Sequence, residues 1–201
     1  MTRAVVVRKA TTTDIPRLAD ALARAFFDDP VMEFILPRER GRRRRLLALF
    51  ELELRRVHLP NDECYTTAEL AGGALWAPPN RWRMPPLAIL RSLPRIVPLL
   101  GTRLPAALRV INVVERAHPR GPHWYLAVLG TEPAQQGKGV GSAMLAPILE
   151  RCDREGEPAY LESSKESNIP FYVRHGFEVT GALELPGGGP TIWPMWREPR
   201  P

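Results

Sequence analysis

Apolar residues recur along the chain with two spacings, one typical of strands and one typical of helices. Short apolar runs between turn residues predict strands over 5–8, 63–67, 73–77, 123–130, 158–163, 178–185 and 191–197. Apolar residues three or four positions apart predict helices over 13–27, 139–155 and 168–175, and a helical region over 31–59 with breaks near Pro37 and Gly41. Strands and helices alternate, which predicts a mixed sheet with helices packed on it.

Two segments of this pattern carry further detail. Asp28-Asp29-Pro30 ends the first helix, whose apolar face consists of Ile15, Leu18, Leu22, Ala25 and Phe26. Residues 81–122 are rich in proline yet apolar, which predicts short, broken helices. Such helices form an irregular wall, and this wall either closes a binding pocket or covers the core as a lid.

Length and composition indicate an ordinary globular protein. The 201 residues, 44% hydrophobic and 25% charged, fit one domain spanning residues 1–201. Cys64 and Cys152 form no CxxC or Cys/His pattern, so we expect buried thiols in a reducing compartment and no metal site. The amino terminus has only four consecutive apolar residues, Ala4 to Val7, too few for a signal peptide or a membrane span. We therefore expect a soluble, cytoplasmic protein with no membrane partner.

The net charge of +6 is concentrated in one segment. Residues 38–45 hold six Arg and one Glu, a net charge of +5, so the rest of the chain carries +1. A basic surface along the whole chain is absent, which argues against nucleic acid as a partner. The run leads into an amphipathic pattern, and we interpret Arg42 to Arg45 as the solvated start of a helix. The alternative is a docking site for an acidic partner.

A run of glycines marks the candidate site. The segment QQGKGVGSAM, residues 135–144, has three glycines in five positions. A Walker loop is excluded, because Glu132 stands where its first glycine belongs and Lys138 is followed by glycine. A dinucleotide fingerprint, and with it a nicotinamide oxidoreductase, is disfavoured, because Ser142 and Met144 stand where it needs glycine.

The segment does fit an anion site between a strand and a helix. Glycines let an anion approach the backbone, and the N–H groups and dipole of the helix start attract negative charge. A plain strand-to-helix turn would need one glycine for positive φ, so three at alternate positions favour phosphate binding.

These segments resemble the GNAT superfamily of N-acetyltransferases. The family's acetyl-CoA motif [QR]xxGx[GA] corresponds to Gln136, Gly139 and Gly141, within LGTEPAQQGKGVGSAML. The segment NIPFYVRHGF is similar to the family's Asn-x-x-x-Tyr-x-x-x-Gly-Phe pattern. The resemblance is strongest over 124–177 and weakest over 81–122. Within the family the chain looks most like the puromycin N-acetyltransferase branch, which suggests an antibiotic-resistance-like activity.

The resemblance implies a fold and a donor site. The fold would be α/β (α+β): a mixed, mostly antiparallel central sheet, helices on both faces and a splayed parallel pair formed by 124–131 and 158–163. Acetyl-CoA would lie in the splay, its pantetheine along the first strand and its pyrophosphate at the glycines, with no metal. The residues implied in cofactor binding are Leu129, Gly130, Thr131, Gln136, Gly137, Lys138, Gly139, Val140, Gly141, Ser142, Asn168 and Tyr172.

The chemistry requires a neutral amine, a donor for the oxyanion and a proton for the departing thiolate. A strand N–H near Leu129 suits the oxyanion. Tyr172 suits the acid, because the reference pKa of a phenol, about 10, lies near that of a thiol. Asn168 and Tyr172 are four residues apart and share a helix face. The alternative for Tyr172 is a half-buried tyrosine with its hydroxyl at the rim.

The general base stays open. Glu162 ends the second splayed strand, and Asp28 and Asp29 lie in a loop that the resemblance places near the acceptor; each also suits ordinary strand-end or turn chemistry. His118 and His123 flank the first splayed strand and could deprotonate an amine.

The expected function is acetyl transfer to a primary amine of a small molecule, by a monomer or homodimer. The alternative is a non-catalytic CoA-binding module that docks an acidic partner through Arg42 to Arg45.

Overall fold

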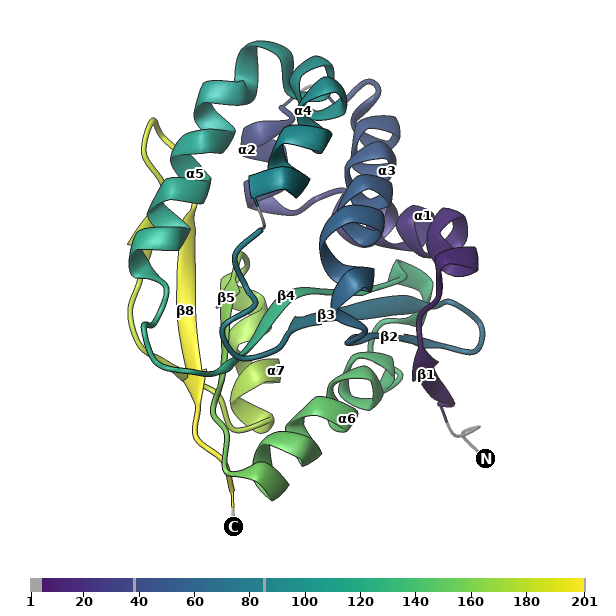
Figure 1. Ribbon diagram of the computed structural model, residues 1–201, viewed down its shortest axis with the longest axis vertical. Helices are drawn as coiled ribbons and strands as arrows, with labels where there is room; N and C mark the ends of the chain where they lie inside the picture. The colour runs from purple at the N-terminus through teal and green to yellow at the C-terminus, as the bar shows by residue number, and fades with distance from the viewer. Residues whose placement is uncertain (1–4, 38, 85, 201) are drawn as a thin grey trace.

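The computed structural model of the chain describes residues 5–37, 39–84 and 86–200 (Figure 1). Its strands are β1 (Val7–Lys9), β2 (Cys64–Thr67), β3 (Gly72–Ala77), β4 (Trp124–Thr131), β5 (Ala159–Ser163), β6 (Glu178–Val179), β7 (Leu183–Glu184) and β8 (Thr191–Arg197). Its α-helices are α1 (Ile15–Ala25), α2 (Pro30–Ile35), α3 (Arg42–Glu53), α4 (Pro86–Leu100), α5 (Leu104–Ala117), α6 (Val140–Glu155) and α7 (Ile169–Arg174). Short helical turns are η1 (Thr12–Asp14), the π-helical η2 (Leu54–His58), η3 (Leu59–Asn61), η4 (Gly101–Arg103), η5 (Pro133–Gln135) and η6 (Glu166–Asn168).

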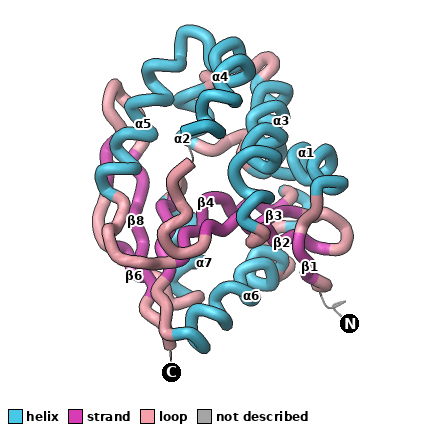
Figure 2. Tube along the Cα trace, viewed as in Figure 1, coloured by secondary structure: helices cyan, strands magenta, loops and turns pink. Residues whose placement is uncertain are grey.

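The strands form one sheet in the order β1-β2-β3-β4-β5-β8-β6, with β7 paired to β8. Every neighbouring pair is antiparallel except β4 and β5, which are parallel. Helices α1 and α3 lie on one face of the sheet and α6 and α7 on the other (Figures 1 and 2). The fold class predicted from the sequence is therefore confirmed.

The parallel pair is short and then diverges. In the described chain β4 and β5 pair only at Trp124–Ala159 and Tyr125–Tyr160. Beyond this point β4 stays paired to β3 and β5 stays paired to β8. The register of β3 against β4 also shifts between Leu75 and Trp76, and such a bulge bends a strand. The two strands thus open into a V, as the resemblance implied.

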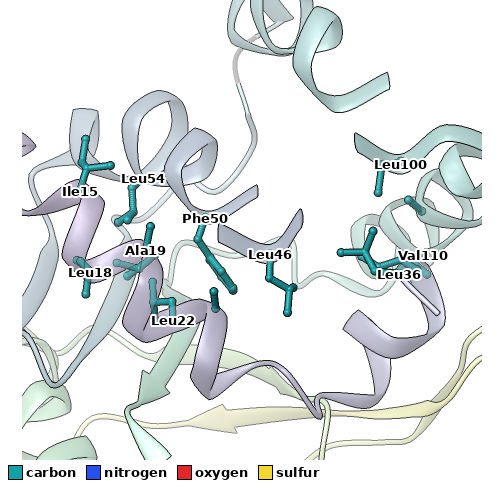
Figure 3. Packing of buried hydrophobic residues seen from close by; sticks show 14 of the residues in the cluster. Ile15, Leu18, Ala19, Leu22, Leu36, Leu46, Phe50, Leu54, Leu100 and Val110 are labelled. Atoms are coloured by element: carbon teal, nitrogen blue, oxygen red, sulfur yellow. The ribbon is translucent and has the colours of Figure 1, made fainter. Parts of the chain in front are cut away.

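Apolar side chains fill both faces of the sheet. On one face, residues of α1 and α3 meet the tip of α2 and residues of α4 and α5 (Figure 3); the cluster includes Ile15, Leu18, Leu22, Leu36, Leu46, Phe50, Leu54, Leu100 and Val110. On the other face, α6 and α7 pack with Trp76 and Trp124. Cys64 and Cys152 are buried free thiols, as expected, and burial raises the pKa of each to about 12.

Two glycines let β4 lie close to its neighbours, Gly72 on the side of β3 and Gly130 on the side of α1. A Cβ built on Gly72 would lie 2.2 Å from the carbonyl oxygen of Gly130 and 2.9 Å from Cα of Thr131. A Cβ on Gly130 would lie 2.8 Å from side-chain atoms of both Leu22 and Phe26 of the α1 segment. The position of β4, which forms one side of the V, therefore depends on the absence of side chains here.

The prediction of short, broken helices over 81–122 is confirmed in part: η4 interrupts the segment, but the two helices are not short. Helices α4 and α5 have 15 and 14 residues. Pro86 and Pro105 stand in the first turn of each helix, where no N–H is required, and Pro94 and Pro98 lie inside α4 on its exposed side. Residues 86–117 also have the length and composition of a membrane span, but η4 divides them into two helices, each shorter than the roughly 20 residues a span needs.

The arginine run is only partly solvated, which corrects its interpretation. Arg38 lies outside the described residues. The side chain of Arg42 is buried, with the residue 6% exposed, because its guanidinium donates to the carbonyl oxygens of Leu36, Phe27 and Pro37 and pairs with Glu33 at 2.7 Å. A docking patch made of all four residues Arg42 to Arg45 is therefore excluded.

The predicted strand over 178–185 forms two short pieces, β6 and β7. Both pair with β8, and Gly181 lies between them.

Candidate active site

A cavity of about 270 Å³ lies where β4 and β5 diverge. Its walls are Leu126 to Thr131 of β4, Leu161 to Ser163 of β5, Tyr172 of α7, and three residues at and just beyond the end of α1, namely Ala25, Phe26 and Asp29. A second cavity of about 370 Å³ lies in front of the glycine loop and the start of α6. Both cavities are lined by Leu129, Thr131, Gln136, Asn168 and Tyr172. They therefore form one groove, which we call the V groove, from the start of α6 to the interior of the sheet.

The glycine loop leaves the start of α6 open. Gly137 and Gly139 have φ of 73° and 79°, a conformation that glycine adopts without strain. Gly139 is the N-cap of α6 and has no side chain to cap it, so N–H groups of the first turn face the V groove. A Cβ on Gly141 would lie 3.2 Å from the ring of Phe171. A different structural requirement thus explains the glycine at each of the three positions.

The V groove brings together nearly all of the residues named from the sequence as cofactor-binding. Those that line it are Leu129, Gly130, Thr131, Gln136, Gly137, Gly139, Val140, Gly141, Ser142, Asn168 and Tyr172. Lys138 turns away from it, because its ammonium group donates to the carbonyl oxygen of Ala134 at 2.7 Å. The side chain of Gln136 donates to the carbonyl oxygen of Thr131 at 3.2 Å, which ties the loop to the end of β4.

Tyr172 stands at the junction of the two cavities. It is 8% exposed, and its ring lies edge-on to Phe171 and Phe177. Burial, with a further contribution from the negative charge of Asp29, raises the pKa of Tyr172 well above that of a free phenol. Its hydroxyl therefore stays protonated at neutral pH.

Asp29 and Asp28 connect two loops across the mouth of the V groove. One oxygen of Asp29 accepts from the N–H groups of Val31 and Met32, each at 3.0 Å, and so caps α2. Its other oxygen accepts from the hydroxyl of Ser164. Asp28 pairs with Lys165 at 2.9 Å. Burial raises the pKa of Asp29, but both of its oxygens already accept hydrogen bonds, which suits a supporting role.

Glu162 of β5 lines the cavity, and its carboxylate is buried behind the wall. Its Oε2 accepts from the hydroxyl of Tyr125 at 2.9 Å, and its Oε1 lies 3.8 Å from Nδ1 of His118. His118 follows α5 and His123 precedes β4, and their Nε2 atoms are 3.0 Å apart. The structure therefore joins three of the candidate bases in one cluster.

The sequence analysis missed several residues of the V groove. Arg174 and Phe171 line it beside the start of α6, and Ser164 and Lys165 form part of its mouth. The signal for Arg174 was its place two residues after Tyr172 on a short helix, next to a predicted anion site. The sequence held no signal for Tyr125, because its contact with Glu162 joins residues 37 positions apart.

A larger hollow of about 610 Å³ lies between α3 and α4. Its lining is chiefly aliphatic and arginine side chains, among them Arg55, Arg56 and Arg95. No residue of the predicted site lines it.

Comparisons with known proteins agree with this geometry. A family model described as the acetyltransferase (GNAT) family matches residues 97–177. An uncharacterized N-acetyltransferase of Schizosaccharomyces pombe is 29% identical over 192 residues, which cover 90% of this chain and 77% of the relative.

Solved structures extend the similarity to the whole chain. One is a histone acetyltransferase HPA2 and related acetyltransferase of Corynebacterium glutamicum, with a TM-score of 0.77 and 28% identity over 99% of this chain and 98% of the other. Another is arylalkylamine N-acetyltransferase 2 of Aedes aegypti, with a TM-score of 0.64 and 10% identity over 98% and 100%; at this identity it shows the fold alone.

The sheet with its diverging parallel pair is thus the mixed α/β GNAT fold. The chain thus shares this fold with known acetyltransferases, and residues 97–177, which include the glycine loop and Tyr172, also match the sequence pattern of the GNAT family.

Proposed function

We propose that this protein is an acetyl-CoA-dependent N-acetyltransferase that acts on a primary amine of a small molecule. The observation that carries the proposal is the continuity of the V groove, from the uncapped start of α6 to the cavity that holds Tyr172 and Glu162. One end suits a pyrophosphate and the other supplies acid–base groups.

The residues present fit the donor. The first-turn N–H groups of α6 and the guanidinium of Arg174 suit the pyrophosphate. The edge of β4 that faces the V lacks a partner strand beyond Tyr125 in the described chain, so its backbone groups suit the amides of the pantetheine arm. A side chain at Gly139 would occupy the space in front of α6.

The reaction needs few protein groups. The amine nitrogen attacks the thioester carbonyl carbon, so a C–N bond forms and the C–S bond breaks. Glu162 takes one proton from the nitrogen, a backbone N–H near Leu129 stabilises the oxyanion, and Tyr172 donates its proton to the departing sulfur. Burial raises the pKa of Tyr172, but burial also raises the pKa of a thiol, as at Cys64, so transfer between phenol and sulfur stays feasible.

The experiment is a panel of amines with acetyl-CoA, read by release of the free thiol. Aliphatic diamines, arylalkylamines and puromycin span the acceptor classes, the last because of the sequence resemblance. We expect turnover of at least one class, together with CoA binding in calorimetry. CoA binding without turnover of any amine would contradict the enzymatic proposal, and loss of both would contradict the donor site as well.

A further inference from the structure

A buried cluster beside the V groove contains two histidines and a carboxylate. His118 and His123 are 6% and 2% exposed, and their Nε2 atoms are 3.0 Å apart. Nδ1 of His123 lies 2.7 Å from the carbonyl oxygen of Gly121. Nδ1 of His118 faces Oε1 of Glu162 at 3.8 Å.

One carbonyl group fixes the protonation pattern of both rings. The carbonyl of Gly121 can only accept, so Nδ1 of His123 carries a proton. In the neutral ring Nε2 of His123 is then an acceptor, and Nε2 of His118 must donate to it. Nδ1 of neutral His118 is therefore a lone pair directed toward Glu162.

In this arrangement one further proton can bind between His118 and Glu162. Nδ1 of His118 and Oε1 of Glu162 are both buried, and neither has a hydrogen-bond partner among the described residues. Oε2 of Glu162 is held by the hydroxyl of Tyr125, so Oε1 is the oxygen free to react. A proton between Oε1 and Nδ1 would satisfy both atoms at once.

The surroundings hold His118 in this orientation. Trp82 stacks on its ring, with centroids 3.7 Å apart, and Tyr160 and Tyr125 contact it edge-on. His118 follows the last turn of α5, and its backbone N–H donates to the carbonyl oxygen of Val114 at 3.0 Å, which fixes the residue at the helix end. Tyr125 and Tyr160 are also ionisable, and burial together with the charge of Glu162 raises the pKa of each. Glu53 of α3 lies near enough for its charge to act on Tyr125.

We propose that Glu162, His118 and His123 act as one proton-accepting unit for the acceptor amine. This rests on the proposed acetyl transfer. A proton leaves the attacking nitrogen for Oε1 of Glu162 and passes to Nδ1 of His118, whose Nε2–H continues to donate to His123. The imidazolium then faces the carboxylate as an ion pair, and the proton returns through Glu162 to water once the product has left. His118 and His123 are positioning residues, because they act through Glu162.

The kinetic test uses His118→Gln and His123→Gln, with His175→Gln, directly after α7, as the matched control. We expect the two cluster variants to lower kcat by at least about tenfold, with little change in KM, and to shift the acidic limb of the kcat profile to lower pH. The acceptor amine in this assay should be one that stays unprotonated over the whole pH range, so that its own ionisation does not contribute to the pH profile of kcat. An acidic limb that is unchanged in His118→Gln would overturn the proposal.

A second test needs neither turnover nor a histidine variant. NMR of the ring nitrogens should show Nδ1–H in His123 and Nε2–H in His118 near neutral pH. Glu162→Gln should shift the ring-nitrogen signals of His118, because Nδ1 then faces an amide in place of a carboxylate, while the exposed Glu184→Gln leaves them unchanged. Other tautomers, or signals of His118 that are indifferent to Glu162, would overturn the proposed unit even if the enzyme acetylates amines. If the spectra are as expected but the protein acetylates no amine, the hydrogen-bonded unit is supported and the proposed function is refuted.

Discussion

Replacement of Gly72 by alanine tests whether close contact of β3 and β4 sets the shape of the V groove. The added Cβ would lie 2.2 Å from the carbonyl oxygen of Gly130, about 1.2 Å closer than the ordinary contact distance of 3.4 Å. The obstructing atoms belong to the backbone of β4 at Gly130 and Thr131, so a side-chain rotation cannot relieve the clash. The strands must therefore separate.

The magnitude follows from this geometry. Overpacking costs about 1–3 kcal/mol, and a backbone clash belongs at the upper end of that range. For a chain of this size each kcal/mol lowers Tm by about 2–4 °C, so we expect a fall of about 5–10 °C in Gly72→Ala. Because Thr131 lines the V groove, a displacement of about 1 Å should also weaken CoA binding and reduce kcat.

The assay is thermal unfolding together with calorimetry of CoA binding. Gly121→Ala is the matched control, because a Cβ there meets no described atom within 4 Å. Gly73→Ala is an intermediate case, since the nearest atom to its Cβ is the flexible end of Leu18 at 3.2 Å, and Leu75 and the carbonyl oxygen of Tyr65 follow at 3.7 Å. The expected fall in Tm is about 5–10 °C, so a Tm of Gly72→Ala within about 1–2 °C of the Gly121→Ala value would refute the reasoning.

Four further predictions follow from single residues. Tyr172→Phe should lower kcat by about 10²-fold or more with little change in KM, while the alkaline limb of the pH profile stays unchanged because burial raises the pKa of Tyr172 beyond the accessible range; single-turnover rates check this. Gly139→Glu should abolish CoA binding and leave Tm within a few degrees, since it adds bulk and negative charge at an open position; calorimetry and thermal unfolding check both. Arg42→Gln should destabilise the protein by about 2–4 kcal/mol in urea unfolding, whereas Arg44→Gln, on the exposed side of α3, should change stability by less than about 0.5 kcal/mol. Burial raises the pKa of Glu53 to about 7, so the native state binds its proton more tightly and loses stability as pH rises from about 4.5 to 7; Glu53→Gln should therefore raise Tm more at pH 8 than at pH 5.

The donor end of the V groove could be predicted because it depends on local sequence. Gly137 and Gly139 adopt positive φ and Gly141 lies against Phe171, so each requirement acts on the backbone of its own residue or on a nearby helix. The strands that flank the loop also have simple apolar patterns. Local rules therefore found both the loop and its neighbours.

The acid–base cluster and the role of Arg42 could not be predicted in the same way. Glu162 meets His118 across 44 positions of sequence, and His118 belongs to the segment 81–122, which was expected to form broken helices. Arg42 looked like one of several surface charges, but it fills the hydrogen-bonding needs of three carbonyl groups at the end of α2 and its flanking loops. A charge pattern does not show which arginine meets such carbonyls.

The two paired positions between β4 and β5 also divide the sheet mechanically. β1 to β4 form one wing and β5, β8 and β6 the other, joined at the narrow end by Trp124–Ala159 and Tyr125–Tyr160 and by the crossover through α6. At the wide end the wings are latched by Asp29 with Ser164 and by Asp28 with Lys165. Backbone pairing thus sets the spacing of the wings at the narrow end, whereas at the wide end the spacing depends on side-chain contacts of two aspartates.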